Sequence, residues 1–178
     1  LPQLFYLSLK EKQYAMSQVK LLQSKIFSKP ELESQLVNWR NTNQKVVFTN
    51  GCFDLLHLGH VNYLAKARDL GDKLIVGLNT DASVQRLKGS SRPIKDELSR
   101  AQILAAMQFI DAVVFFDEET PIGLISRVKP DILVKGGDYT TDGIVGHELV
   151  LKNGGDVRTI EFVAGYSSST LIDKISKG

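Results

Sequence analysis

Short, wholly apolar runs alternate with amphipathic segments along the chain from residue 45 onward. Five runs predict buried strands because they are apolar on both faces, at 46–49, 74–78, 112–116, 132–134 and 157–162. Helical spacing predicts the segments between and after them as helices, at 60–70, 81–88, 96–109, 121–128, 145–152 and 169–175. Strands that are buried on both faces and separated by helices are typical of a parallel sheet covered on two sides. We therefore expect an α/β fold, a doubly wound, Rossmann-like parallel sheet of five strands.

The first 44 residues have a different pattern. Apolar residues there recur at the spacing of two helix faces, with Val19, Leu22 and Ile26 on the first, and Leu32, Leu36 and Trp39 on the second. All 14 glycines of the chain follow this segment. We expect an N-terminal helical arm at residues 1–44 and one domain at residues 45–178. Two helices alone cannot bury both apolar faces, so the arm should pack on that domain or on a second subunit of a homo-oligomer.

Composition narrows the classes of function. Lys and Arg number 22 against 20 Asp and Glu, and the resulting net charge of +2 argues against nucleic-acid binding through a broad basic surface. No apolar run is long enough to cross a bilayer, so no membrane partner is expected. The single cysteine, Cys52, cannot form an intrachain disulfide, which indicates a reducing, cytoplasmic location.

The segment after the first predicted strand carries the clearest chemistry. It reads NGCFDLLHLGH, from Asn50 to His60. His57 and His60 lie three residues apart at a helix entrance and share one face, and Gly59 between them lets an anion approach the backbone. Together with the amides and positive dipole end of the helix, these groups predict a polyphosphate site whose imidazoles donate to oxygens that gain charge. The alternative interpretation is one buried structural histidine and one surface histidine.

Two more loops supply candidate ligands for a phosphorylated substrate. Lys88 and Arg92 lie in a basic segment that could close over phosphates, although a solvated basic loop has the same composition. The fourth strand is followed by Lys135, Gly136, Gly137 and Asp138, in which the glycines allow close approach and Asp138 can accept hydrogen bonds from sugar hydroxyls. The alternative for this second loop is a simple turn.

A third loop precedes the last predicted helix. Four hydroxyl residues follow one another from Ser167 to Thr170, shortly after Gly165. Hydroxyls and unpaired amides at a helix start predict a second anion site. A plain N-cap explains one of these hydroxyls, but not four.

The sequence NGCFDLLHLGH resembles the signature of the HxGH nucleotidyltransferase superfamily, which includes cytidylyltransferases and adenylyltransferases. Segments 76–81, 91–94, 135–139 and 167–170 resemble those of the heptose 1-phosphate adenylyltransferase (ADP-heptose synthase) domain, which in many chains is fused behind a sugar kinase. The resemblance covers about residues 45–178 and implies that they form a nucleotidyltransferase domain.

This resemblance implies a reaction of ATP with a sugar 1-phosphate, D-glycero-D-manno-heptose 1-phosphate, that yields an ADP-sugar and pyrophosphate. The implied catalytic residues are His57, His60 and Lys88. The nucleotide would be held by the two histidines and by Asn50, Gly51, Cys52, Phe53, Gly59, Arg100, Gly165, Ser167, Ser168, Ser169 and Thr170. The acceptor would be held by Asp81, Lys88, Arg92, Lys135, Gly137 and Asp138. For Arg100, a surface ion pair with Glu97 on the same helix is an equally weighted alternative.

The expected reaction also involves a metal ion and a partner enzyme, and two other functions are alternatives to it. No carboxylate cluster indicates a dedicated metal site, so Mg²⁺ is expected to enter with ATP, held by phosphates and water. A separate sugar kinase is the expected partner enzyme. The alternative enzyme is a cytidylyltransferase that uses CTP and a polyol or amino-alcohol phosphate such as glycerol 3-phosphate. A nucleotide-sensing module without turnover is the alternative outside enzymes, and the complete set of His57, His60 and Ser167–Thr170 argues against it.

Overall fold

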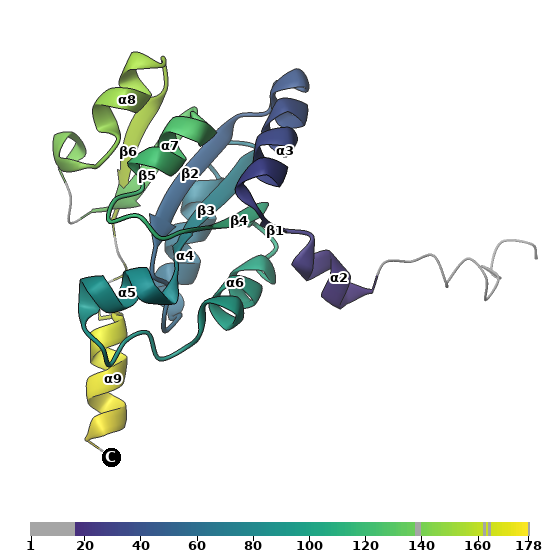
Figure 1. The fold of residues 1–178 in the computed structure, drawn as a ribbon. Helices are drawn as coiled ribbons and strands as arrows, with labels where there is room; N and C mark the ends of the chain where they lie inside the picture. Colours follow the sequence, from purple (N-terminus) through teal and green to yellow (C-terminus); the bar gives the residue numbers. More distant parts are fainter. Residues whose placement is uncertain (1–16, 138–139, 162, 164, 178) are drawn as a thin grey trace, which may run out of the picture.

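The computed structural model describes residues 17–137, 140–161, 163 and 165–177. Within these residues one parallel sheet has the strand order β1-β4-β3-β2-β5-β6 (Figure 1). Its strands are β1 (Ile26–Phe27), β2 (Val46–Gly51), β3 (Lys73–Asn79), β4 (Ala112–Phe116), β5 (Ile132–Gly136) and β6 (Asp156–Ile160). The expected α/β class and doubly wound parallel sheet are confirmed, with six strands in place of five.

The additional strand comes from the N-terminal segment. Ile26 and Phe27 pair with Val113 and Val114 of β4, so the expected helical position of Ile26 is wrong. A strand of two residues is too short to show an alternating pattern, and its pairing partner lies more than 80 residues away. Local sequence therefore contains no signal for it.

Helices cover both faces of the sheet (Figure 1). They are α2 (Gln18–Gln23), α3 (Lys29–Asn41), α4 (Leu58–Arg68), α5 (Asp81–Lys88), α6 (Glu97–Ala105), α7 (Ile122–Val128), α8 (His147–Lys152) and α9 (Ser168–Ser176), with a 3-10 turn at Thr141–Gly143. Residues of α3, α7 and α8 form one apolar core with the sheet, and residues of α4 and α6 form a second core on the other face. No helix in these described parts is long and apolar enough to cross a membrane.

The strand order fixes where a ligand can bind. From β2 the chain proceeds outward through β3 and β4, and then crosses back to place β5 on the other side of β2. In sheets of this kind the crevice lies beyond the carboxyl ends of the strands, at the point where the order reverses. The seam between β2 and β5 is that point.

Helix α3 belongs to the core. Ser28 caps it, accepting a hydrogen bond from the Glu31 amide while the Glu31 carboxylate accepts one from the Ser28 amide. Leu32, Leu36 and Trp39 on its inner face are exposed by 2%, 1% and 7%. The expected packing of the arm on the main domain is thus observed for α3, where Trp39 belongs to the core, whereas residues 1–16 of the arm lie outside the described residues.

Truncating this inner face should destabilise the whole domain. Leu36→Ala should lower the free energy of unfolding by about 2–5 kcal/mol, because it leaves a cavity in a packed core. Val37→Ala is the matched control, since Val37 is 55% exposed and its loss should cost less than about 0.5 kcal/mol. Urea denaturation of both variants measures the difference. Equal stability of the Leu36 variant and the wild type would show that α3 docks only loosely.

Candidate nucleotide-binding site

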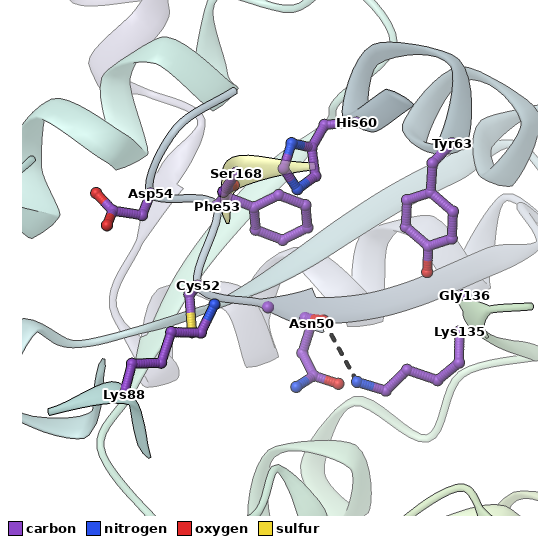
Figure 2. A pocket seen from close by; sticks show the side chains of 11 residues that line it. Asn50, Cys52, Phe53, Asp54, His60, Tyr63, Lys88, Lys135, Gly136 and Ser168 are labelled. Carbon is purple, nitrogen blue, oxygen red and sulfur yellow. Dashed lines mark hydrogen bonds between the residues drawn. The ribbon is translucent and has the colours of Figure 1, made fainter. Parts of the chain in front are cut away.

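A pocket of about 310 Å³ opens at the carboxyl ends of β2 and β5 (Figure 2). The residues lining it come from both strands, from the β2–α4 loop and from helices α4, α5 and α9: Asn50, Gly51, Cys52, Phe53, Asp54, His60, Tyr63, Lys88, Lys135, Gly136 and Ser168. The pocket therefore lies at the reversal of strand order, as the topology requires.

The two histidines of the H-x-G-H sequence lie against each other at the start of α4. Their ring centroids are 3.9 Å apart with planes inclined by 32°, and the ring of Phe53 meets His60 edge-on at 5.4 Å. A Cβ on Gly59 would lie 3.0 Å from the His57 ring, so any larger residue would press on this imidazole. No side chain caps α4, so its first amides remain available to an anion.

Both imidazoles are held in the neutral form. Burial, together with the nearby His57 and Lys88, lowers the pKa of His60 to about 4, and burial also lowers the pKa of His57. The Nδ1 atoms of both rings are buried without a hydrogen-bond partner among the described residues. An anion in the pocket would offset the cost of charging these rings, so the pair is suited to a ligand with several negative charges.

Asp54 fastens the β2–α4 loop to the segment that follows α5. Its carboxylate is only 2% exposed and accepts hydrogen bonds from Nε of Arg92 at 2.6 Å and from the amides of Ile94 and Lys95 at 2.9 and 3.0 Å. Burial raises the pKa of Asp54, but the two amides and Arg92 outweigh it and leave the pKa below its usual value. Arg92, expected to bind the acceptor from a mobile basic loop, is thus committed to a protein carboxylate through Nε.

Arg100 fastens the same loop from behind. Its side chain is fully buried and donates to the carbonyls of Cys52 and Lys95, at 2.7 and 3.1 Å, and to Oδ1 of Asp81 at 2.8 Å. The alternative of a surface ion pair with Glu97 is wrong, because the Glu97 carboxylate accepts from the Asp81 amide instead. Arg100 does not line the pocket, and Asp81 is its ion-pair partner.

Lys88 and Lys135 bring positive charge to the pocket from two sides, with Asn50 and Cys52 between them (Figure 2). Lys135 donates from Nζ to the carbonyl of Asn50 at 3.4 Å. The Oδ1 atom of Asn50 is buried without a hydrogen-bond partner in the described structure. With Asp54 neutralised by Arg92, the lysines set the sign of the local field, which favours phosphate groups.

The hydroxyl residues before and in α9 divide into two roles. Ser167 accepts a hydrogen bond from the Thr170 amide, and the two hydroxyls bond to each other at 2.8 Å, so they form an N-cap. Ser168 lines the pocket and donates to the carbonyl of Leu55 at 3.1 Å, which joins α9 to the loop before the histidines. Ser169 is exposed, and Gly165 adopts φ of +84° ahead of them.

The structure brings eight of the expected site residues together around the pocket: Asn50, Gly51, Cys52, Phe53, His60, Lys88, Lys135 and Ser168. His57 and Gly59 adjoin them through the imidazole pair. The remaining described candidates lie outside the pocket lining: Asp81, Arg92, Arg100, Gly137, Gly165, Ser167, Ser169 and Thr170. Asp138 lies outside the described residues.

Sequence reasoning missed Asp54 and Tyr63 as pocket residues, whereas Gly136, named with Gly137 as a glycine that allows close approach, does line the pocket. Asp54 stands inside the H-x-G-H signature segment, and Tyr63 follows His60 by three residues and so shares its helix face. That helical spacing was a usable signal for Tyr63.

The described part of the chain offers no cluster of three or more His, Cys, Asp or Glu side chains suited to a metal ion. Among the described residues that line the pocket, Asp54 carries the carboxylate, and its oxygens already accept hydrogen bonds from Arg92, Ile94 and Lys95. These residues do not form a protein cage for Mg²⁺, and we assign no step to a protein-held metal.

Residues 48–173 match the model of the cytidylyltransferase-like family. The chain belongs to that family. It is 58% identical over 152 residues to the bifunctional protein HldE of Citrifermentans bemidjiense and 53% identical over 148 residues to HldE of Rhodopseudomonas palustris. These matches cover 85% and 83% of the chain, but only 31% and 30% of the relatives' own length.

Two solved structures are similar to this chain in fold. A lipopolysaccharide core biosynthesis protein from Thermoplasma volcanium is 32% identical, with a TM-score of 0.56 over 67% of this chain and 97% of its own. A pantoate-beta-alanine ligase from Francisella tularensis has a TM-score of 0.52 at 15% identity, over 86% of this chain and 79% of its own, and this second likeness concerns the fold alone.

The neutral state of His60 predicts a pH dependence of stability. The folded chain binds fewer protons than the unfolded chain between about pH 4 and 6.5, so stability should rise with pH across this window and be lost as pH falls. His60→Asn, which cannot titrate, should flatten this part of the profile, and His57→Asn should flatten it less. Urea denaturation at several pH values measures the slopes. Identical slopes in the wild type and His60→Asn would contradict the neutral, buried imidazole.

Proposed function

We propose that the chain is an adenylyltransferase that joins ATP and a sugar 1-phosphate, D-glycero-D-manno-heptose 1-phosphate, to give an ADP-sugar and pyrophosphate. The observation that carries the proposal is the pair of imidazoles of His57 and His60, whose Nδ1 atoms have no partner among the described residues, beside an uncapped helix start and Lys88. Identity of 58% to a bifunctional HldE protein supports the choice of nucleotide and sugar. Membership of the cytidylyltransferase-like family supports the reaction class.

The proposed reaction is an in-line displacement at phosphorus. A phosphate oxygen of the sugar 1-phosphate attacks the α-phosphorus of ATP, a new P–O bond forms, and the bond to the pyrophosphate oxygen breaks. No protein nucleophile is needed, so the site acts by positioning both phosphates and by stabilising charge.

His57 and His60 stabilise the negative charge that develops on pyrophosphate as it leaves. Among the residues that the structure describes, their neutral rings have no hydrogen-bond partner at Nδ1. Phosphate oxygens near the rings favour protonation, so nucleotide binding should be accompanied by proton uptake. The proton then counters the negative charge as the leaving group departs.

The cations around the pocket have different tasks in this proposal. Lys88 and Lys135 contact phosphates directly, since both line the pocket. Arg92 and Arg100 act as positioning residues, because they donate to Asp54 and to backbone carbonyls of the loops that form the site. Mg²⁺ is proposed to accompany ATP, held by phosphate oxygens and water.

The acceptor must itself be made by phosphorylation of a sugar. The HldE relatives are bifunctional proteins about three times the length of the matched segment. We propose that a sugar kinase, on the same polypeptide or separate, supplies the sugar 1-phosphate. A cytoplasmic location is proposed because ATP and a free thiol at Cys52 both fit a reducing compartment.

A matrix of nucleotides and acceptors tests the assignment. With Mg²⁺ present, ATP and heptose 1-phosphate should release pyrophosphate at least tenfold faster than CTP with the same acceptor or ATP with glycerol 3-phosphate, since one mispaired polar contact costs about that much. Pyrophosphate release is the readout, and each substrate omitted in turn is the control. Preference for CTP with glycerol 3-phosphate would move the chain to the cytidylyltransferase alternative.

The imidazole pair yields a kinetic prediction. His57→Ala or His60→Ala should lower kcat by about 10²–10³ while raising KM for ATP less, because the charge they stabilise is greatest in the transition state. Steady-state kinetics and melting temperatures must come from the same preparations. Loss of stability with normal kinetics of the folded fraction would support a structural role instead, and full turnover by His60→Ala would end its catalytic assignment.

A further inference from the structure

Strands β2 and β5 separate at their carboxyl ends, where the pocket lies. Their ladder in the described chain consists of two pairs, Val47 with Ile132 and Phe48 with Leu133. On their other sides, β2 continues to pair with β3 as far as Gly51, and β5 with β6 as far as Gly136. The opening is therefore confined to the β2–β5 seam.

The next pair in this register would be Thr49 and Val134, and the hydroxyl of Tyr63 lies between them. Tyr63 Oη donates to the Val134 carbonyl at 3.2 Å and lies 2.7 Å from Thr49 Oγ1. With the Tyr63 proton used in this way, the Thr49 hydroxyl is left to donate to Tyr63. Thr49 is fully buried and Tyr63 is 6% exposed, so these side-chain bonds follow the last paired position of the ladder inside the core.

Side-chain bonds across the seam continue toward the pocket. Asn50 and Lys135 would form the following pair, and there the ammonium of Lys135 donates to the Asn50 carbonyl at 3.4 Å (Figure 2). Beyond them Gly51 and Gly136 line the pocket itself. Along the seam, backbone pairing thus gives way to a hydroxyl bridge, then to an ammonium bridge, and then to open space.

Core packing explains the ring of Tyr63 but not its hydroxyl. The ring belongs to the apolar core on the α4 face, where a phenylalanine would pack equally well. A buried hydroxyl is costly unless its hydrogen bonds are made, and here one bond reaches Thr49 on β2 and the other reaches Val134 on β5, so that together they bridge the seam. The function of the Tyr63 hydroxyl is therefore to be sought at the seam between β2 and β5.

We propose that Tyr63 is a positioning residue whose hydroxyl keeps the β2–β5 seam open, so that the backbone of residues 50–51 and 135–136 faces the nucleotide instead of the opposite strand. This inference rests on the proposed function, because it concerns how that same site admits its nucleotide. Tyr63 also lies one turn after His60 on α4, so a single helix face sets both the imidazole and the width of the seam.

Tyr63→Phe tests the proposal because it removes the hydroxyl and keeps the ring. We expect ATP affinity, measured by calorimetry with Mg²⁺, to fall about tenfold, and KM for ATP to rise more than kcat falls. Without the hydroxyl, β2 and β5 should approach each other in the ligand-free variant. Hydrogen exchange of the amides at residues 135–136 should therefore be slower than in the wild type. Thr49→Val should lower ATP affinity in the same way. The double variant should bind ATP little more weakly than either single variant, because both substitutions disrupt the same hydroxyl bridge.

Thr42→Val is the matched control. The Thr42 hydroxyl also donates to backbone carbonyls, those of Asn38 and Trp39, but it precedes β2 at the opposite edge of the sheet. Its loss should lower the melting temperature without changing ATP affinity. The same pattern in Tyr63→Phe would show a merely structural role and overturn the proposal.

Failure of the proposed function is distinguishable from failure of this inference. If the wild type binds no ATP, the proposed function fails, and hydrogen exchange of the free protein then decides the inference alone. Slower exchange at residues 135–136 in Tyr63→Phe supports an opening role for the hydroxyl, and unchanged exchange overturns it. If the wild type binds ATP and Tyr63→Phe binds it within twofold, the inference fails while the function stands.

Discussion

The geometry of the site depends on one buried guanidinium, that of Arg100. It lies outside the pocket, yet its donors reach the Cys52 carbonyl in the β2–α4 loop, the Lys95 carbonyl before α6, and the carboxylate of Asp81 at the start of α5. Three segments that follow or precede different elements are thereby held at fixed positions around one group. A buried charge with all these bonds is costly to disturb, because any shift would leave it without a partner. The loop that presents the histidines is therefore rigid before any ligand arrives.

This rigidity has an electrostatic consequence. A flexible loop would let the imidazoles turn toward water and regain their ordinary pKa. The fixed loop instead keeps His60 against Phe53, and it keeps His57 where its Nδ1 has no partner within the described part of the chain. The folded protein accepts the cost of desolvating two imidazoles in advance. A polyphosphate that enters meets donors that are already oriented, so little free energy is spent on reorganisation during the reaction. Asp54 serves the same end, because its bond to Arg92 prevents a carboxylate at the pocket from repelling phosphate.

Much of this arrangement could be predicted from sequence because it is local. Apolar runs located the five longer strands, and the H-x-G-H sequence located the imidazole pair at a helix entrance. The failures involve partners distant in sequence. Strand β1 is defined by β4, more than 80 residues away, and Arg92 and Arg100 look like surface cations until Asp54, Cys52 and Asp81 are placed beside them. Spacing along one segment does not reveal which carboxylate or carbonyl another segment supplies.

The two lysines show how topology turns such partners into a site. Lys88 ends α5, which follows β3 on one side of β2, and Lys135 lies in β5 on the other side. The chain must pass outward through β4 and return across the sheet before the second lysine can face the first. The positive field of the pocket is thus a product of strand order, since neither segment alone carries both charges. Backbone pairing between β2 and β5 ends after Phe48 and Leu133, at this same reversal of strand order, so the space of the pocket and its positive charge lie at the same place.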